Sequence, residues 1–246
     1  MSASHADTAE KPRRFYKSVS TAPEGAGFAV RLDGRQARTP AGAPLVVPTE
    51  ALAELLAAEW AAQGETINLA AMPANRLAAT ALDRAPTARN GLAEEVARFA
   101  DADLLCYFAE APQALLEREV AHWGPVLDWA EASLGLDLVR ATGVAHRPQP
   151  PDAVARARTL AAALPDFELT ALAFAAALFG SAVLALALQR GQLTGDAAFD
   201  LSRLDETFQE EHWGVDQEAG ERARHMREDA EMLQRWFEAL RQSHTG

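Results

Sequence analysis

Hydrophobic and polar residues follow two different patterns along the chain. Near the start, short stretches at residues 15–20, Gly27–Leu32 and 35–39 are predicted strands, and the Asp33-Gly34 pair is a strong signal for a two-residue hairpin turn. The stretch at 44–48 is bounded by prolines, which confine it to a sheet edge. These residues predict a small antiparallel sheet.

After residue 48 the apolar positions recur at the three- and four-residue spacing of helices. Thr49 is placed to cap the first helix and Gly64 to end it, and Pro112 marks a candidate domain boundary. We therefore predict an α+β protein with a loose tail at 1–12, a mixed domain at 13–112 and an all-helical domain at 113–246. Further helices are predicted at 73–84, 88–100, 115–134, 153–163, 169–190, 196–213 and 218–242.

The segment 169–188 holds twenty residues without a charge, which is long enough to cross a bilayer as a helix. Eight of the twenty are alanine, which favours membrane insertion less than larger apolar residues do, and Gly180 and Ser181 interrupt the middle. We predict a helix buried inside a helical domain, with no stable membrane insertion. A membrane span is the alternative.

Charge and cysteine content restrict the possible functions. The chain has a net charge of −12 and a pI near 5.0, so nucleic acid and anionic membranes are expected to repel it. The acid excess is uneven, because residues 11–38 carry a net charge of +5 and residues 201–246 carry −5. A single cysteine, Cys106, excludes an internal disulfide and fits a reducing compartment. The first residues include acidic Asp7 and Glu10 and lack an apolar run, so we expect no targeting segment.

Signatures of catalysis are sparse. Phosphate-binding, dinucleotide-binding, serine-hydrolase and zinc-protease motifs do not occur in the sequence. The sequence contains a single E-x-x-H pair, Glu119 and His122. A di-iron bundle requires two such pairs, so we predict no metal site. Cys106 is predicted to be a small buried hydrophobe. The alternative to a binding protein is an acid-base or metal-assisted hydrolase with a site between the domains, built on Asp101, Asp103, Glu119 and His122.

The most informative stretch is SRLDETFQEEHWG at 202–214. On a helix Leu204 and Phe208 face inward, while the opposite side carries acids together with a tryptophan. Acids around an aromatic residue are typical of a surface that binds a basic, partly apolar protein. The spacing leaves open whether the tryptophan lies at an interface or in the core. The candidate partner-binding residues are Asp205, Glu206, Gln209, Glu210 and Trp213.

At these residues the sequence resembles the Atp-twelve family, the assembly chaperones that escort the alpha subunit of the F-type ATP synthase in mitochondria and alphaproteobacteria. The resemblance runs from Arg14 to about Arg224. It is carried by five pieces in the family's order: RFYKSV, LDGRQARTPAGAPLVVPTEALAELLAAEW, DADLLCY, HWGPVLDW and SRLDETFQEEHWG.

The resemblance implies a non-enzymatic chaperone without a cofactor, whose carboxy-terminal domain is an orthogonal helical bundle. Its partner would be the unassembled alpha subunit, held in the bacterial cytoplasm or the mitochondrial matrix with the beta-facing surface covered. Family members commonly have glutamate where this chain has Asp205, so Asp205 and Glu206 both remain candidates for the important acid. Phe108 stands where the family often has arginine. We expect a monomer when free, and structural roles for Trp60, Asp103, Trp123, Trp129 and Phe208.

Overall fold

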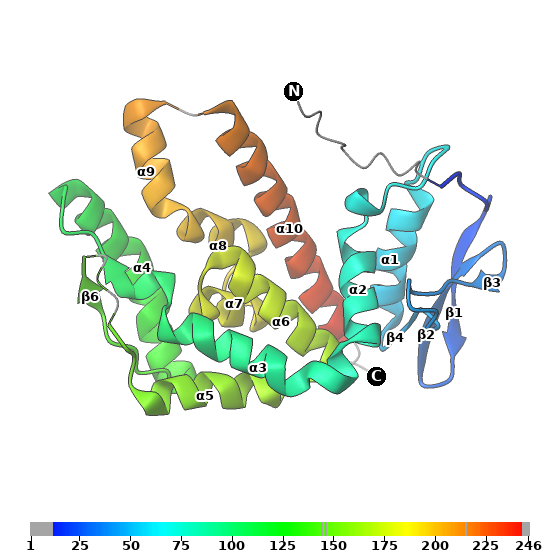
Figure 1. The fold of residues 1–246 in the computed structure, drawn as a ribbon, viewed down its shortest axis with the longest axis horizontal. Coiled ribbons are helices and arrows are strands. Elements are labelled where there is room, and N and C mark those ends of the chain that lie inside the picture. Colours follow the sequence, from blue (N-terminus) through cyan, green and yellow to red (C-terminus); the bar gives the residue numbers. More distant parts are fainter. Residues whose placement is uncertain (1–11, 144, 146, 215, 243–246) are drawn as a thin grey trace, which may run out of the picture.

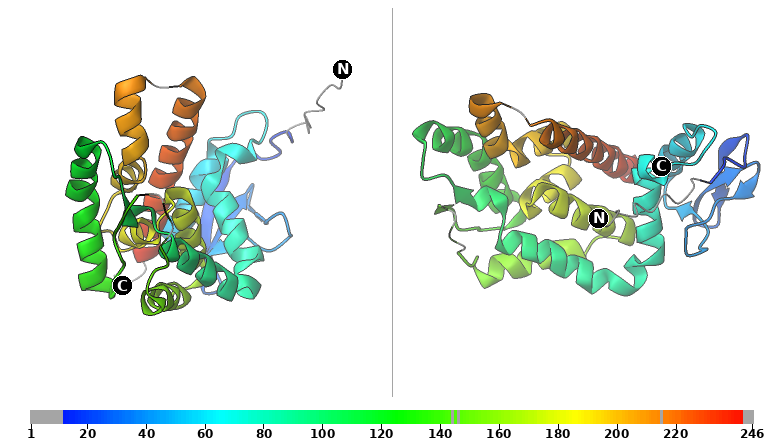
Figure 2. Two further views of the ribbon diagram at one scale, coloured as in Figure 1. Left: turned by 60° about the vertical axis from the view of Figure 1, so that its left-hand side comes forward. Right: turned by 45° about the horizontal axis from the view of Figure 1, so that its top comes forward.

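The computed structural model describes residues 12–143, 145, 147–214 and 216–242. Strands and helices separate along the molecule, with the sheet at one end and the α1 and α2 helices between it and the remaining helices (Figure 1). The two further views in Figure 2 show the same arrangement. The predicted α+β class with a small antiparallel sheet is confirmed. The tail predicted at 1–12 falls outside the described residues except for Pro12.

The sheet is built around β2. Strands β1 (Val19–Glu24), β3 (Arg35–Gln36) and β4 (Val46–Val47) all pair antiparallel with β2 (Gly27–Leu32). The turn between β2 and β3 is the predicted one, because Asp33 and Gly34 both have positive φ, at 49° and 76°. The first strand begins later than predicted, at Val19, because the amides of Lys17 and Ser18 donate to the Asp33 carboxylate of the turn instead of to a strand.

Helical segments make up most of the remaining chain. Thr49 caps α1 as predicted, and its hydroxyl oxygen accepts a hydrogen bond from the Leu52 amide at 3.0 Å. The helices are α1 (Glu50–Ala61), α2 (Pro73–Asp83), α3 (Ala85–Asp101), α4 (Gln113–Leu134), α5 (Pro151–Ala162), α6 (Asp166–Phe179), α7 (Ala182–Gln189), α8 (Gly195–Ser202), α9 (Leu204–Trp213) and α10 (Gln217–Arg241), with short 3-10 turns η1 (Leu69–Ala71) and η2 (Leu104–Cys106).

The long apolar segment is two helices and not the single predicted one. Gly180 ends α6 in the left-handed conformation at φ 64°, and Ser181 caps α7 through its hydroxyl. Every residue of α7 from Ala182 to Leu188 is buried among the other helices. No helix in the described part of the chain has both the length and the hydropathy needed to cross a bilayer.

The segment predicted as one helix at 196–213 is also divided. Arg203 separates α8 from α9. A further pairing was not predicted: β5 (Tyr107–Phe108) runs parallel to β6 (Ala141–Thr142), and it ties the segment before α4 to the segment after it.

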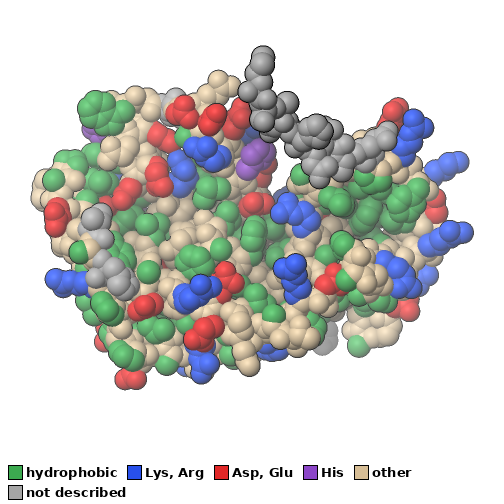
Figure 3. Space-filling view, in the orientation of Figure 1, with side chains coloured by type: hydrophobic (Ala, Val, Ile, Leu, Met, Phe, Trp, Pro, Cys, Tyr) green, Lys and Arg blue, Asp and Glu red, His purple; other side chains and the backbone are tan. Residues whose placement is uncertain are grey.

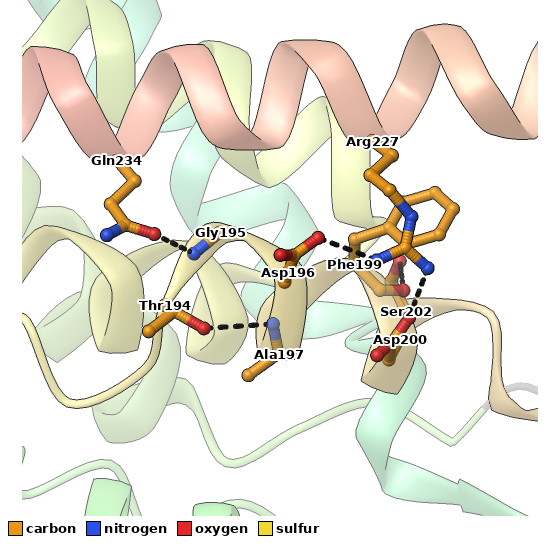
Figure 4. Close-up of polar contacts among 9 residues, drawn as sticks. All are labelled: Thr194, Gly195, Asp196, Ala197, Phe199, Asp200, Ser202, Arg227 and Gln234. Atoms are coloured by element: carbon orange, nitrogen blue, oxygen red, sulfur yellow. Dashed lines mark hydrogen bonds and ion pairs between the residues drawn. The ribbon is translucent and has the colours of Figure 1, made fainter.

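α8 packs closely against α10. Gly195 lies so close to α10 that an added Cβ would be 2.4 Å from the Ala230 carbonyl oxygen. The Arg227 guanidinium bridges the Asp196 and Asp200 carboxylates at 2.6 Å each and lies 4.4 Å from the centre of the Phe199 ring (Figure 4). These contacts fix the base from which α9 extends.

Buried apolar side chains form one continuous cluster. It extends from Tyr16 and Val30 beside the sheet through α6 and α7 to Trp236 of α10. The division into domains at 13–112 and 113–246 stays a prediction, and the core runs across it.

Candidate interaction surface

α9 projects to one tip of the molecule, at the end opposite the sheet (Figure 1). Its outer side carries Glu206, Gln209 and Trp213, all exposed, and the Trp213 side chain is 85% exposed. In the space-filling view the hydrophobic surface at this tip is a single green group beside tan and red surface (Figure 3). Helical spacing left open whether Trp213 lies in the core or on the surface, and the structure places it on the surface.

The inner side of α9 is anchored to the bundle. Leu204 and Phe208 are buried, as predicted from their spacing. The Trp123 indole N–H of α4 donates a 3.0 Å hydrogen bond to the Leu201 carbonyl, which holds the end of α8 just before α9 begins. The helix is thus a fixed platform for its outer face.

Two arginines neutralise part of the acidic surface. Arg118 of α4 forms a two-bond ion pair with Glu211, with both distances 2.9 Å. Arg203 bonds Glu210 at 2.8 Å, and both of these side chains are partly buried. Glu210 is therefore already paired, whereas Glu206 has no ion-pair partner among the described residues.

Asp205 faces a carboxyl group of another helix. Glu119 of α4 is fully buried, and its Oε2 accepts a 2.7 Å hydrogen bond from the Ala109 amide. Glu119 Oε1 and Asp205 Oδ1 are buried and receive no N–H or O–H bond from the described residues, while the two carboxyl groups lie within hydrogen-bonding reach of each other. A proton on Glu119 would let this carboxyl group donate a hydrogen bond to Asp205.

The environment supports this protonation. Burial first, and then the hydrogen bond and negative charge of Asp205, raise the pKa of Glu119 to about 7, although the bond from the Ala109 amide acts in the opposite direction. The described residues place no Lys or Arg within ion-pair distance of either carboxyl group. At neutral pH this pair therefore holds its proton only partly.

A pocket of about 770 Å³ opens beside Asp205. Asp205 and Glu110 supply its acidic groups, and its apolar walls come from Leu104, Phe108 and Ala109. Glu206 does not line it and points to solvent. The two adjacent acids therefore have different positions, one at a pocket and one on the open face.

Comparisons with known proteins agree with this architecture. The family model described as "ATP12 chaperone protein" matches residues 13–131. Atp12 of Paracoccus denitrificans is 39% identical, with a TM-score of 0.87 over 93% of this chain and 98% of that one. The chain belongs to the Atp12 chaperone family.

Other relatives extend the comparison. The Atu1473 protein of Agrobacterium tumefaciens is 44% identical, with a TM-score of 0.87 over 93% of this chain and 86% of its own. The mitochondrial protein atp12 of Schizosaccharomyces pombe is 27% identical over 222 residues, which cover 85% of this chain and 76% of the relative. The predicted family is confirmed, and with it the prediction of a chaperone and not an enzyme.

The residues of the alternative hydrolase site do not come together in this Atp12 family member. Glu119 is buried while His122, one turn later, is exposed. The Asp103 carboxylate binds the amides of Leu105 and Val183, at 3.1 and 3.0 Å. Within the described residues no group of three His, Cys, Asp or Glu side chains is arranged to hold a metal ion.

The residues predicted to be structural are buried to different degrees. Trp123, Asp103 and Phe208 are buried, and Trp60 and Trp129 are partly buried against the core. Burial raises the pKa of Asp103 to about 6, against the lowering effect of its hydrogen bonds to Ser181 and the α7 amides. Cys106 is buried as predicted, and burial raises the pKa of its thiol.

Sequence reasoning missed the role of Glu119 in this site of the Atp12 chain. The sequence assigned Glu119 to an E-x-x-H pair and to the alternative hydrolase site, whereas its neighbour in the fold is Asp205. No spacing rule joins two residues that lie so far apart in sequence. The only signal was indirect, because Glu119 falls between Leu115 and Trp123 on the buried side of its helix.

Proposed function

We propose that this Atp12 family member is an assembly chaperone for the catalytic head of the F-type ATP synthase and binds the unassembled alpha subunit. An unassembled subunit of a permanent ring exposes a large apolar interface that aggregates unless it is covered. The chaperone would cover the beta-facing surface until beta replaces it. It would act where the head is assembled, in the bacterial cytoplasm or the mitochondrial matrix.

The α9 face is the proposed recognition surface. The observation that carries this assignment is Trp213, a large aromatic side chain held 85% exposed at the end of an anchored helix. Fully exposed tryptophans are uncommon on monomers, and tryptophan is among the residues that contribute most to binding when a partner buries it. Glu206, Gln209 and Glu210 surround it with acidic and polar groups that suit a basic partner surface.

Asp205 would bind differently from the open face. Asp205 lines its pocket, and the buried Glu119 carboxyl group, whose pKa is raised, lies behind it; the described residues place no cation in ion-pair contact with either group. A Lys or Arg side chain of the alpha subunit that enters the pocket would pair with Asp205, and its positive charge would favour loss of the proton from Glu119 behind it. This interaction would be specific, and it would be reversible when the true partner removes the chaperone.

Co-purification tests the partner assignment. The tagged full chain is mixed with separately expressed alpha subunit, beta subunit and assembled head. We expect retention of the isolated alpha subunit and no retention of the assembled head, whose alpha surfaces are covered. Binding to none of the three, or to beta alone, would overturn the proposal.

Single substitutions then test the surface. Trp213→Ala and Asp205→Asn should each weaken alpha binding by about tenfold or more, because each removes a central contact. Glu117→Gln, an exposed acid on α4, is the matched control and should leave binding unchanged. Thermal unfolding of Trp213→Ala should match the wild type, since surface changes cost under about 0.5 kcal/mol. Unchanged affinity in both variants would remove α9 from the proposal.

A further inference from the structure

A second pocket lies at the opposite end of the molecule, where the sheet extends past α1. It has a volume of about 630 Å³ and is lined by Phe15, Tyr16, Leu32, Trp60, the turn residue Asp33, and residues 35–38, which begin with β3. Arg35 pairs with Leu32 across the sheet, so both side chains are on the face that packs against α1. The pocket therefore lies between the sheet and α1, at an edge that is open to solvent.

The aromatic walls of this pocket are held in place. The Tyr16 hydroxyl donates a 2.7 Å hydrogen bond to the Trp60 carbonyl, and the two rings meet edge to face at 5.7 Å. The Trp60 indole N–H donates to Asn75 Oδ1 at 2.8 Å. Phe15 packs its edge on Tyr16 yet remains 72% exposed. A binding partner would meet a preformed apolar surface, which lowers the entropic cost of association.

Positive charge surrounds the pocket. Arg35 and Arg38 are exposed at its rim, and Lys17 is exposed beside Tyr16. The described residues supply neither an ion pair nor a hydrogen bond to the Arg35 guanidinium, and Arg38 bonds only the Gly42 carbonyl, at 2.7 Å. Lys and Arg side chains also project from the edge of this lobe in Figure 3.

The one acid in the lining, Asp33, offsets only part of this positive charge. Asp33 accepts hydrogen bonds from the Lys17 and Ser18 amides at 3.0 and 2.8 Å, and another from the Ser18 hydroxyl at 3.0 Å. These bonds, that from the Ser18 amide first, lower the pKa of Asp33, and the nearby Lys17 also contributes to the lowering. These hydrogen bonds hold residues 17 and 18 against the turn, next to Phe15.

We propose that this pocket is a docking site for an extended acidic protein segment that carries a large apolar side chain. The acidic groups would pair with Arg35, Arg38 and Lys17, and the apolar side chain would pack between Phe15 and Trp60. A nucleic acid fits less well, because the chain as a whole carries −12 and repels a polyanion beyond the local patch. The site lies at the end opposite α9, so it does not depend on the proposed function.

Fluorescence anisotropy with the full-length chain tests the proposal. The probe is a labelled ten-residue peptide in which glutamates flank one leucine and one phenylalanine, and its counterpart with lysine in place of glutamate is the control peptide. We expect the acidic peptide to bind, to bind more weakly as salt rises, and to protect residues 15–18 and 32–38 from hydrogen exchange. The lysine peptide should not bind.

Variants locate the binding site. Arg35→Glu with Arg38→Glu, and separately Phe15→Ala, should each weaken peptide binding by about tenfold or more without changing the melting temperature. Arg98→Glu, an exposed charge reversal on α3, should have no effect, and Asp205→Asn should also bind the peptide normally. The proposal is overturned by an acidic peptide that does not bind, by binding that ignores both sets of variants, or by tighter binding of a single-stranded oligonucleotide at the same residues.

Discussion

Glu119 and Asp205 are carboxyl groups from different helices that meet in a partly buried site, and two negative charges cannot both be accommodated there without a cation. The folded chain therefore favours a proton on this pair. An unfolded chain separates the two groups and lets each titrate at its ordinary pKa. This difference couples folding to pH.

The sign of that coupling can be tested with Glu119→Gln. The pKa of Glu119 is about 7 in the fold and ordinarily 4.5, so its proton stabilises the fold below about pH 4.5, and this stabilisation is lost as the pH rises through 7. A neutral glutamine keeps one hydrogen-bond donor toward Asp205 at every pH. The difference in free energy of unfolding between Glu119→Gln and the wild type should therefore shift by about 1–3 kcal/mol in favour of the variant as the pH rises from 5 to 8.

Urea unfolding at several pH values measures this difference. Glu117→Gln, on the same helix but exposed, should follow the wild type at every pH. Parallel curves for wild type and Glu119→Gln would show that no proton is shared.

Asp103 is a buried acid with a different task. One carboxylate oxygen accepts from the Leu105 amide and the other from the Val183 amide, so the side chain joins η2 to the start of α7. Asp103→Asn replaces one acceptor by an NH₂ group and leaves a buried N–H without a partner. It should cost about 1–3 kcal/mol at neutral pH, measured by urea unfolding. Asp137→Asn, an exposed counterpart, should be neutral, and an equally neutral Asp103→Asn would refute the role.

At this scale the sequence pointed to the helix that carries Asp205 and Glu206 but could not distinguish the environments of these two acids. Helical spacing places Asp205 and Glu206 on neighbouring sides, and only the position of α4 decides which of them meets a buried carboxyl group. The position of Trp213 was likewise undecided, because spacing gives a direction around a helix and not what lies there.

Among the helices, the crossing of α8 and α10 depends on the absence of one side chain. Gly195 donates its amide to Gln234 Oε1 at 2.7 Å, and this close approach brings Arg227 over α8 (Figure 4). A Cβ at Gly195 would be 2.4 Å from the Ala230 oxygen, which belongs to the backbone and cannot rotate away.

Gly195→Ala should therefore force the two helices apart. We expect a loss of about 1–3 kcal/mol in stability and a lower melting temperature, since overpacking of a tight contact costs this much. Gly91→Ala is the matched control: Gly91 lies in α3 with no atom within 4 Å of an added Cβ, so alanine should stabilise its helix by about 0.5–1 kcal/mol. Stabilisation in both variants would contradict the close crossing.

The sequence predicted where helices occur better than it predicted where one helix ends and the next begins. The amphipathic segments gave α2, α4 and α10 nearly to their ends, because one polar face repeats along each of them. The segment that became α6 and α7 is buried on all sides, so it has no polar face whose shift would reveal the turn at Gly180. β5 and β6 pair through two residues each, a signal too short to recognise in the sequence.

Across the whole molecule the charge is unevenly distributed: the basic segment lies at the sheet end, whereas the acidic segment runs through α9 and along α10 back to α1. The sequence already placed a net +5 on residues 11–38 and −5 on residues 201–246. The fold adds what composition cannot give: it brings Phe15 and Trp60 together beside the basic residues, and it brings Glu119 to Asp205 at the other end. The pocket at the sheet end therefore has exposed cations beside the exposed Phe15, and the outer face of α9 has an exposed acid beside the exposed Trp213.

The shared proton makes a prediction about the complex with the proposed client. If a cation of the alpha subunit displaces the proton from the Glu119 and Asp205 pair, binding releases a proton, and affinity must rise as the pH rises from 6 to 8. The other charged groups near the pocket are Glu110, which also lines it, and Arg118 and Arg203, which are paired with Glu211 and Glu210. Glu119→Gln should bind with a flatter pH dependence because it has no proton to release.

Isothermal titration of alpha subunit into the chain, repeated in buffers of different ionisation enthalpy, counts the protons released. Glu206→Gln is the control, because that acid lies outside the pocket and should keep the pH dependence even if overall affinity falls. Affinity that falls from pH 6 to pH 8, or that changes equally in the wild type and Glu119→Gln, would mean that no cation enters the pocket. Proton release confined to chains that keep both carboxyl groups would assign the linkage to this pair, since neither group alone holds a shared proton.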